Sequence, residues 1–248
     1  MKFYLGTHRP CWLRREDYPL FVSHRTLSVY KTVPEALAPW ALDSGGFTEL
    51  SMHGGWVTTP AEYITAVRRY ADEVGRMDWA APQDWMCEPQ ILAKTGLTVL
   101  DHQQRTVDNY LTLRTLDAGL PIVPVLQGWE ADDYLRHVGM YADAGVDLFT
   151  EATVGLGTVC RRSAVEPIGN LVRELAGAGI RLHGFGVKIT GLRKFGDVLA
   201  SADSMAWSYN ARRNPPLEGC THKNCANCVH WARRWRDRVL DVVEEVAA

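Results

Sequence analysis

The sequence contains no apolar run near the roughly 20 residues that a membrane-spanning helix needs. Its amino terminus, MKFYLGTHRPCW, also lacks the apolar core and cleavage site of a signal peptide. These absences predict a cytoplasmic protein without a membrane partner. No low-complexity segment, internal repeat or Pro/Ser linker divides the chain. Its 248 residues, 46% hydrophobic and 23% charged, have the composition of an ordinary globular protein with a sizeable core.

A G-x-G-x-x-G motif is absent after the first apolar run, which argues against a dinucleotide-binding fold. Instead, short apolar runs alternate with helical patterns. The runs are FYLG (3–6), LFVS (20–23), WALDS (40–44), MDWAAP (77–82), IVPVLQG (122–128), ATVGLG (152–157), LHGFGV (182–187) and SMAWS (204–208). Apolar spacings of three and four predict helices over 61–74, 101–119 and 132–145. The first two connections are too irregular for full helices.

Eight strands with mainly helical crossovers predict an α/β protein, a closed (β/α)8 TIM barrel over residues 1–211. Residues 212–248 then form a smaller segment and a helix packed on this barrel. In such a fold the chemistry lies where strands run out into loops. Polar residues and one glycine stand at these ends: Asp43, Asp84, Gln127, Gly155, Lys188 and Ser208.

The stretch ALDSGGFTEL (41–50) places Asp43, Ser44 and two glycines directly after a buried strand. A solvated turn needs only one glycine, so Gly45 and Gly46 indicate a backbone that comes close to a ligand. Taken alone, Asp43 or Asp84 could equally cap a helix, and Gln127 could be a structural hydrogen-bonding residue. Their order along the chain favours a shared site.

The motifs LDSGGF, PQDWMCEP, VLQGW, VGLG, FGVK and ADSMAWSYNAR, with a late Cys/His cluster, occur in one order from Asp43 to Cys228. This ordered set resembles the tRNA-guanine transglycosylases and their DNA-acting relatives that insert 7-deazaguanines. The resemblance implies a zinc-containing (β/α)8 barrel that exchanges guanine in a polynucleotide. The chain is much shorter than the tRNA-acting enzymes, so the polymer is left open between DNA and tRNA. The inserted base, queuine, one of its precursors or guanine itself, is open too.

By this resemblance, Asp203 is the nucleophile and Asp43 the second catalytic carboxylate. Asp84 and Gln127 read the guanine edge, the backbone at Gly155 and Leu156 contacts the same base, and Phe47 and Phe185 sandwich it. The remaining substrate-binding candidates come from the same motifs: Ser44, Gly45, Gly46, Gly128 and Lys188. Lys188 either touches a phosphate or pairs with a carboxylate.

Base exchange breaks one N-glycosidic bond and makes another at the same carbon. A carboxylate that attacks this carbon divides the reaction into two displacements, while a second carboxylate moves the proton of the base. A carboxylate such as Asp84 can accept from guanine N1–H and its exocyclic amine, and an amide such as Gln127 can donate to O6. Aromatic faces such as Phe47 and Phe185 add about 1–3 kcal/mol of stacking per base.

The chain has few cysteines outside one cluster. Cys11, Cys87 and Cys160 are scattered, as reduced thiols are in cytosolic proteins. The stretch CTHKNCANCVH (220–230) offers four ligands for a structural, tetrahedral Zn²⁺: Cys220, His222, Cys225 and Cys228. His230 is the alternative fourth ligand, and reduced cysteines without metal are the plain alternative.

Charge is unevenly distributed. Residues 205–238 carry a net charge of +5 and leave −7 for the rest of the chain, whose total is −2. A basic end on a mildly acidic body fits a surface that faces phosphates. Two alternatives stay open: an N-glycosidase or base-exchange enzyme on free nucleosides or nucleotides, and a non-catalytic nucleic-acid-binding subunit. The oligomeric state is also open, with a homodimer as one candidate.

Overall fold

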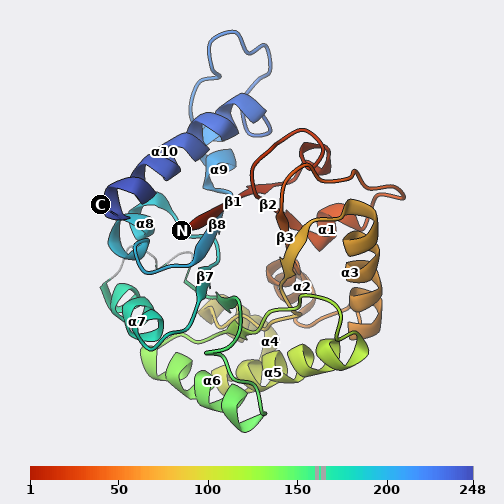
Figure 1. Ribbon diagram of the computed structural model, residues 1–248, viewed down its shortest axis with the longest axis vertical. Helices are drawn as coiled ribbons and strands as arrows, with labels where there is room; N and C mark the ends of the chain where they lie inside the picture. Colours follow the sequence, from red (N-terminus) through yellow and green to blue (C-terminus); the bar gives the residue numbers. More distant parts are fainter. Residues whose placement is uncertain (160–161, 163–165, 248) are drawn as a thin grey trace.

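The computed structural model describes residues 1–159, 162 and 166–247, so Cys160 lies outside the described residues. Eight parallel strands form one curled sheet in the order β4-β3-β2-β1-β8-β7-β6-β5, with helices outside it (Figure 1). The strands are β1 (Lys2–Thr7), β2 (Leu20–Ser23), β3 (Trp40–Asp43), β4 (Met77–Ala80), β5 (Val125–Leu126), β6 (Val154–Leu156), β7 (Leu182–Gly184) and β8 (Ser201–Ser204).

The two ends of this sheet approach each other at one point. An isolated parallel bridge joins Ala80, the last residue of β4, to Ile122, three residues before β5. The amide of Ala80 donates to the carbonyl of Pro121 at 2.9 Å, and the amide of Val123 donates back to the carbonyl of Ala80 at 3.1 Å. The α/β class is therefore confirmed, with a single bridge where a regular barrel has a full strand pair.

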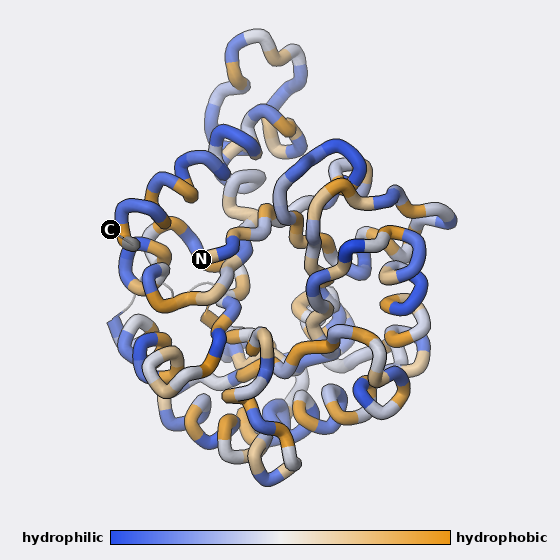
Figure 2. Tube along the Cα trace, viewed as in Figure 1, coloured by the Kyte–Doolittle hydropathy of each residue, from blue (hydrophilic) through white to orange (hydrophobic). Residues whose placement is uncertain are grey.

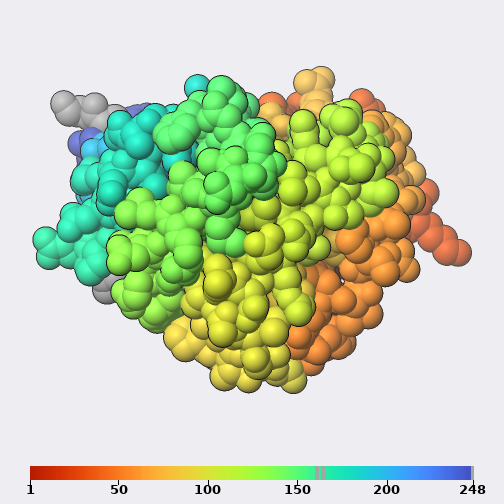
Figure 3. Space-filling model, turned by 90° about the horizontal axis from the view of Figure 1, so that it is seen from below, coloured from red at the N-terminus to blue at the C-terminus, as the bar shows by residue number. Residues whose placement is uncertain are grey.

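Helices follow the strands and surround the sheet. They are α1 (His24–Leu27), α2 (Gly46–His53), α3 (Pro60–Val74), α4 (Pro89–Thr95), α5 (Val99–Leu116), α6 (Ala131–Asp143), α7 (Glu166–Gly177), α8 (Ile189–Phe195), α9 (Ala206–Arg213) and α10 (Val229–Ala247), with a 3-10 turn η1 (Pro10–Trp12). Seen from below in Figure 3, successive segments cover one face in chain order, from orange on one side to teal on the other. In the described part of the chain, none of these helices is long and apolar enough to cross a bilayer.

Local chemistry explains where the long helices begin. The Thr59 and Thr98 side chains accept hydrogen bonds from the backbone of Glu62 and Asp101, whose carboxylates bond back to the threonine amides. These two capping boxes satisfy amides that a helix start leaves unpaired. Hydropathy alternates along the helical turns in Figure 2, as expected for helices that bury one side against the sheet.

The alternation of side chains along each strand separates two apolar layers. Residues such as Leu5, Leu42 and Leu156 face the helices in the main core. Alternate residues form a second cluster inside the curl, made of Tyr4, Phe21, Ala41, Trp79, Ala81 and Val123 with Phe185 packed against it. The interior is thus filled by aromatic side chains, and this filling forms the floor of the site described below.

The eighth strand differs from the sequence prediction. SMAWS (204–208) was expected to be the strand, but β8 is Ser201–Ser204 and Trp207 and Ser208 lie in α9. Trp207 is buried because its ring stacks on Trp12 with centroids 5.5 Å apart, and its Nε1–H donates to the carbonyl of Gly6 at 2.8 Å. A buried tryptophan at the start of a helix therefore gives this stretch the apolar pattern of a strand. Ser208 is consequently not a strand-end residue.

Candidate active site

A cavity of about 280 Å³ opens among the loops that follow the strands. Seven of the residues predicted from the sequence line it together: Asp43, Gly46, Phe47, Asp84, Gln127, Phe185 and Asp203. Asp43 and Asp203 lie in β3 and β8, and the others lie in the segments that follow β3, β4, β5 and β7. The curl of the sheet brings these segments into one space. Both proposed catalytic carboxylates therefore face the same cavity.

Asp43 is the last residue of β3, and its Oδ1 accepts a hydrogen bond from the Gly45 amide at 3.0 Å. Burial raises the pKa of this carboxyl, while bonds from the Gly45 amide and the Ser23 hydroxyl lower it and the charge of Asp203 raises it further. Both acids line the same cavity, so the charge of one acts on the other. A carboxyl with a raised pKa is suited to hold and release a proton.

Asp203 lies in β8, where it pairs in register with Tyr4 of β1. Its Oδ1 accepts from the Gly186 amide at 2.9 Å and contacts Nε2 of His183 at 3.3 Å. The side chain is only 7% exposed, and that exposed part faces the cavity. A carboxylate held from behind in this way is presented to a ligand in a fixed orientation.

Asp84 and Gln127 form a joined pair on the cavity wall. The Gln127 Nε2 donates to Asp84 Oδ2 at 2.5 Å, and the Ser44 hydroxyl donates to Asp84 Oδ1 at 3.3 Å. Burial raises the pKa of Asp84 to about 7; Gln127 lowers it and the charge of Asp43 raises it. An amide nitrogen has two hydrogens, so Gln127 can hold Asp84 with one and offer the other to a ligand oxygen.

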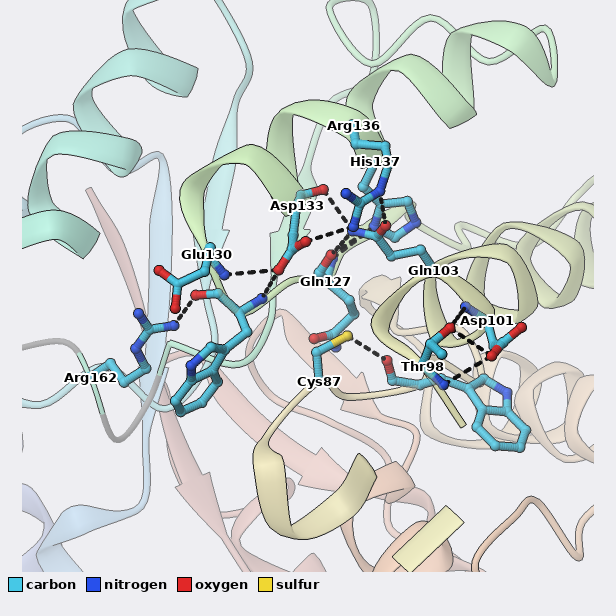
Figure 4. A network of polar contacts seen from close by, with 12 residues as sticks. Cys87, Thr98, Asp101, Gln103, Gln127, Glu130, Asp133, Arg136, His137 and Arg162 are labelled. Carbon is cyan, nitrogen blue, oxygen red and sulfur yellow. Dashed lines mark hydrogen bonds and ion pairs between the residues drawn. The ribbon is translucent and has the colours of Figure 1, made fainter. Parts of the chain in front are cut away.

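The backbone and side chain of Gln127 are both fixed. The Thr158 hydroxyl donates to Gln127 Oε1 at 2.6 Å, which sets the amide orientation. Behind the strand, the backbone amide of Gln127 donates to Nδ1 of His137 at 2.9 Å. Nε2 of Gln103 donates to the backbone carbonyl of Gln127 at 2.7 Å (Figure 4). Burial lowers the pKa of His137 to about 4, so this ring remains a neutral acceptor at neutral pH.

Gly45 explains part of the LDSGGF motif. It precedes α2 with φ +82°, a left-handed conformation that residues with a Cβ rarely adopt. This turn directs the Gly45 amide back at Asp43, and it lets Gly46 begin α2 at the cavity wall. The helix amino terminus, with its partial positive charge, therefore lies beside the carboxylates.

A comparison with known protein families finds a match over the whole chain. The profile of the family described as DpdA, DeoxyPurine in DNA protein A, covers residues 1–248. This chain belongs to the DpdA family. No curated protein matches it. The family fits the resemblance to the transglycosylases and, between the polymers left open by the sequence, indicates DNA.

Phe47 and Phe185 differ in their surroundings in this DpdA-family chain. The Phe47 side chain is 43% exposed at the cavity rim, whereas Phe185 is partly buried on the interior aromatic cluster. A Cβ at Gly155 would lie 2.6 Å from the Phe185 ring, so the glycine in β6 makes room for this ring. Gly155 thus supports the cavity from beneath rather than lining it.

The other predicted substrate-binding residues are not among those that line the cavity. Ser44 reaches it through its bond to Asp84, and the Leu156 side chain points into the main core. Gly128 packs against Asp133 and Tyr134 at the start of α6. Lys188 is an exposed residue that precedes α8 and is outside the cavity lining.

Sequence reasoning did not find several cavity residues. Thr158 orients Gln127 and has φ +57°, which is unusual for a β-branched residue and indicates local strain at the site. Met86 and Glu88 line the wall beside Asp84, and His183 contacts Asp203. The motifs CEP and LHGFG contained two of them, but a single glutamate or histidine in an apolar run carries no distinct signal.

The Cys/His cluster forms between α9 and α10, in the loop that projects at the top of Figure 1. Ligand atoms of Cys220, His222, Cys225 and Cys228 all lie within 4.8 Å of one another. Cys220 Sγ is 3.9 Å from Cys228 Sγ. Zinc–sulfur bonds of about 2.3 Å in a tetrahedron require sulfurs about 3.8 Å apart. The four residues therefore fit a metal ion, and His230 is not among them.

The cluster is joined to the site through α9. The Ser208 hydroxyl donates to the Ala226 carbonyl inside the cluster loop at 2.8 Å. Met205, which directly precedes α9, lines the cavity. Desolvation, together with the charge of Arg212 on α9, lowers the pKa of His8 on the cavity wall. The exposed arginine is thus within electrostatic reach of the cavity.

Helix α10 fastens the carboxy-terminal segment to the beginning of the chain. Arg233 pairs with the buried Glu16 at 2.8 Å, the Trp235 ring lies 6.0 Å from Phe3, and Arg236 lies over Tyr18. These contacts place residues 229–247 against β1 and its following loop. The carboxy-terminal helix is therefore packed on the body of the molecule.

Proposed function

We propose that this chain exchanges guanine in DNA for a 7-deazaguanine through a covalent Asp203–deoxyribose intermediate. The observation that carries the proposal is the single cavity shared by Asp43, Asp203, Asp84 and Gln127. Two acids suit the displacement, and an acid–amide pair suits a guanine edge. Membership of the DpdA family supports DNA as the polymer.

The target base leaves the duplex and enters the cavity. A volume of about 280 Å³ is near the lower end of small-ligand pockets, roughly 300–1,000 Å³, and is too small for stacked base pairs. The target nucleotide must therefore be flipped from the stack, at a cost of a few kcal/mol. Phe47 at the rim and Phe185 at the floor offer the faces between which a base can stack.

Recognition uses hydrogen-bond complementarity. Asp84, as a carboxylate, accepts from N1–H and the exocyclic amine, and the second hydrogen of the Gln127 amide points to O6. 7-Deazaguanines present the same edge, so one pocket serves the leaving and the incoming base. Because a buried acceptor left unpaired is costly, adenine is rejected.

The exchange proceeds in two displacements. An oxygen of Asp203 bonds to C1′ while the C1′–N9 bond breaks, and protonated Asp43 gives its proton to the departing guanine. The incoming deazaguanine then loses its N9 proton to Asp43 and attacks C1′, which releases Asp203. Each proton and electron pair is returned, so the enzyme ends as it began.

Further structural proposals accompany this function. The curled sheet is a (β/α)8 barrel closed through the Ala80–Ile122 bridge. The Cys/His cluster holds a structural Zn²⁺, since four protein ligands leave no open coordination position. The basic residues of α9 and α10 face DNA phosphates, and the homodimer stays a prediction.

The test is adduct formation on a denaturing gel. The protein is incubated with guanine-containing DNA, tRNA or a mononucleotide, with and without each 7-deazaguanine. We expect a DNA adduct that Asp203→Ala abolishes and Asp43→Asn slows, whereas Asp197→Asn, a surface carboxylate paired with Arg173, leaves it unchanged. An undiminished adduct in the Asp203 variant would overturn the assignment, and turnover of the mononucleotide alone would favour a nucleoside-level enzyme.

A further inference from the structure

His183 is a fully buried histidine in β7 that the proposed chemistry does not use. Its imidazole is packed among the rings of Tyr4, Phe21, Trp79 and Phe185, with centroids 4.5–5.8 Å away. A polar ring in an aromatic setting is costly unless both nitrogens are paired. Its retention inside the sheet therefore points to a task for the ring nitrogens.

Both nitrogens have partners on the next strand. Nδ1 lies 2.9 Å from the Ser201 hydroxyl, and Nε2 lies 3.3 Å from Asp203 Oδ1. An ionised carboxylate can only accept, so Nε2 carries a hydrogen and donates it to Asp203. In the neutral ring Nδ1 then accepts from the Ser201 hydroxyl. Ser201 thus fixes the tautomer that Asp203 requires.

The second support of Asp203 falls on the same oxygen. The Gly186 amide donates to Oδ1 at 2.9 Å. Within residues 1–159, 162 and 166–247, both hydrogen bonds of this carboxylate are therefore on Oδ1. The strand pair β7–β8, with His183 opposite Ser201 in register, holds this arrangement rigidly.

From this geometry we propose that His183 is a positioning residue that presents Oδ2 of Asp203 to the sugar. The inference rests on the proposed function. Oδ2 bonds to C1′ as the C1′–N9 bond breaks, and the electron pair leaves with guanine, which takes the Asp43 proton. Oδ1 becomes the ester carbonyl and keeps both donors. When the incoming base attacks, the same donors stabilise the negative charge that returns to the Asp203 carboxylate.

The experiment compares two substitutions of His183. His183→Phe keeps a planar ring among the aromatic neighbours but removes both hydrogen bonds, while His183→Gln keeps a donor near the position of Nε2. We expect the phenylalanine variant to lower kcat for guanine release on the order of 10–100-fold with KM within about twofold, because a misplaced reacting atom costs about this much. The glutamine variant should recover at least tenfold of the loss.

Tyr141→Phe is the matched control. Its hydroxyl is also buried and bonded to one strand, through the amide and carbonyl of Val125, but it is outside the cavity lining. We expect it to lower the melting temperature comparably while kcat of the folded enzyme stays unchanged. Equal losses of kcat in this control and in His183→Phe, or no recovery with glutamine, would overturn the positioning role.

A crystal structure of His183→Phe separates this inference from the function itself. If the wild-type protein exchanges no base, the proposed function fails, and the structure alone decides the role of His183. We expect the Asp203 carboxylate to rotate so that its bond to Gly186 is lost or moves to the other oxygen. An unchanged carboxylate would overturn the inference whatever the activity.

Discussion

The cavity and the Cys/His cluster are assembled in opposite ways. Residues of the cavity come from Gly6 to Met205, whereas the four ligands of the cluster lie within nine residues. The cavity contains buried carboxyls whose pKa values are raised by burial and lowered by hydrogen bonds. The cluster gathers thiols that a metal ion would neutralise. One region therefore depends on the whole fold, and the other on a local loop and the ion proposed for it.

The two regions therefore contribute differently to the stability of the folded state. Burial of Asp84 and Asp43 in the cavity raises their pKa values, so their ionised forms destabilise the folded state. The cluster would gain its order on binding the proposed ion, because metal binding and local folding are coupled. The two regions meet at α9 through the Ser208–Ala226 hydrogen bond.

Among changes that leave Asp43 and Asp203 in place, the largest expected effect comes from Asp84→Asn. An amide cannot accept from both guanine donors at once, so exchange should fall on the order of 10²–10³-fold. The same change removes a buried charge and should raise the free energy of unfolding on the order of 1–3 kcal/mol. Exchange assays and denaturant melts measure the two effects. A variant that loses both activity and stability would show that Asp84 is structural.

Metal removal should weaken exchange about tenfold through α9. Chelation or Cys225→Ser should disorder the loop between α9 and α10, and Zn²⁺ should restore the chelated protein. Bound metal is measured by native mass spectrometry and exchange by guanine release. Cys11→Ser, which changes a partly exposed thiol outside the cluster, is the control. Full activity of the metal-free protein would show that the cavity does not depend on the Cys/His cluster.

Lowering the pH should weaken guanine binding by up to tenfold per pH unit below about 7, because Asp84 takes up a proton there and can no longer accept twice. Stability should change in the opposite direction. Between about pH 4 and 7 the folded state binds the extra proton, so the free energy of unfolding falls as the pH rises through this window. Titration calorimetry and melts measure both, and Asp84→Asn should reduce each dependence.

The smallest expected effect is that of Gly45→Ala. A left-handed φ of +82° costs an alanine about 1–2 kcal/mol, and the new Cβ would meet the flexible Arg25 side chain at 2.9 Å. We expect a lower melting temperature and a loss of exchange below tenfold. Gly139→Ala is the control, since nothing lies within 4 Å of a Cβ there inside α6. An equally stable Gly45 variant would contradict the role of this turn.

Much of this arrangement follows from local patterns in the sequence. Six of the eight predicted runs contain β2 to β7, and the first, FYLG (3–6), lies inside β1. The three predicted helices match α3, α5 and α6 apart from their ends. Capping residues and apolar periodicity are local, so they can be read without the fold. The ligand spacing of the Cys/His cluster is local as well, and the structure brings those four residues together.

What the sequence left out depends on contacts across the fold. Trp207 reads as part of an apolar strand because its partners, Trp12 and the Gly6 carbonyl, are about two hundred residues away. Thr158 and His183 matter through Gln127 and Asp203, to which they are brought by neighbouring strands. Asp43, Asp84 and Asp203 were predicted through the family resemblance, since any one acid after a strand has the same local pattern as a helix cap.

The single bridge between Ala80 and Ile122 has a kinetic consequence. Every other neighbouring pair of strands shares at least two registered residue pairs, so the seam beside Asp84 is the place where the sheet opens at least cost. Amide protons of Ala80 and Val123 should therefore exchange with solvent sooner than those of β1 and β8. Local opening of the molecule would begin at the cavity wall for which base recognition is proposed, and a bound purine should slow this opening.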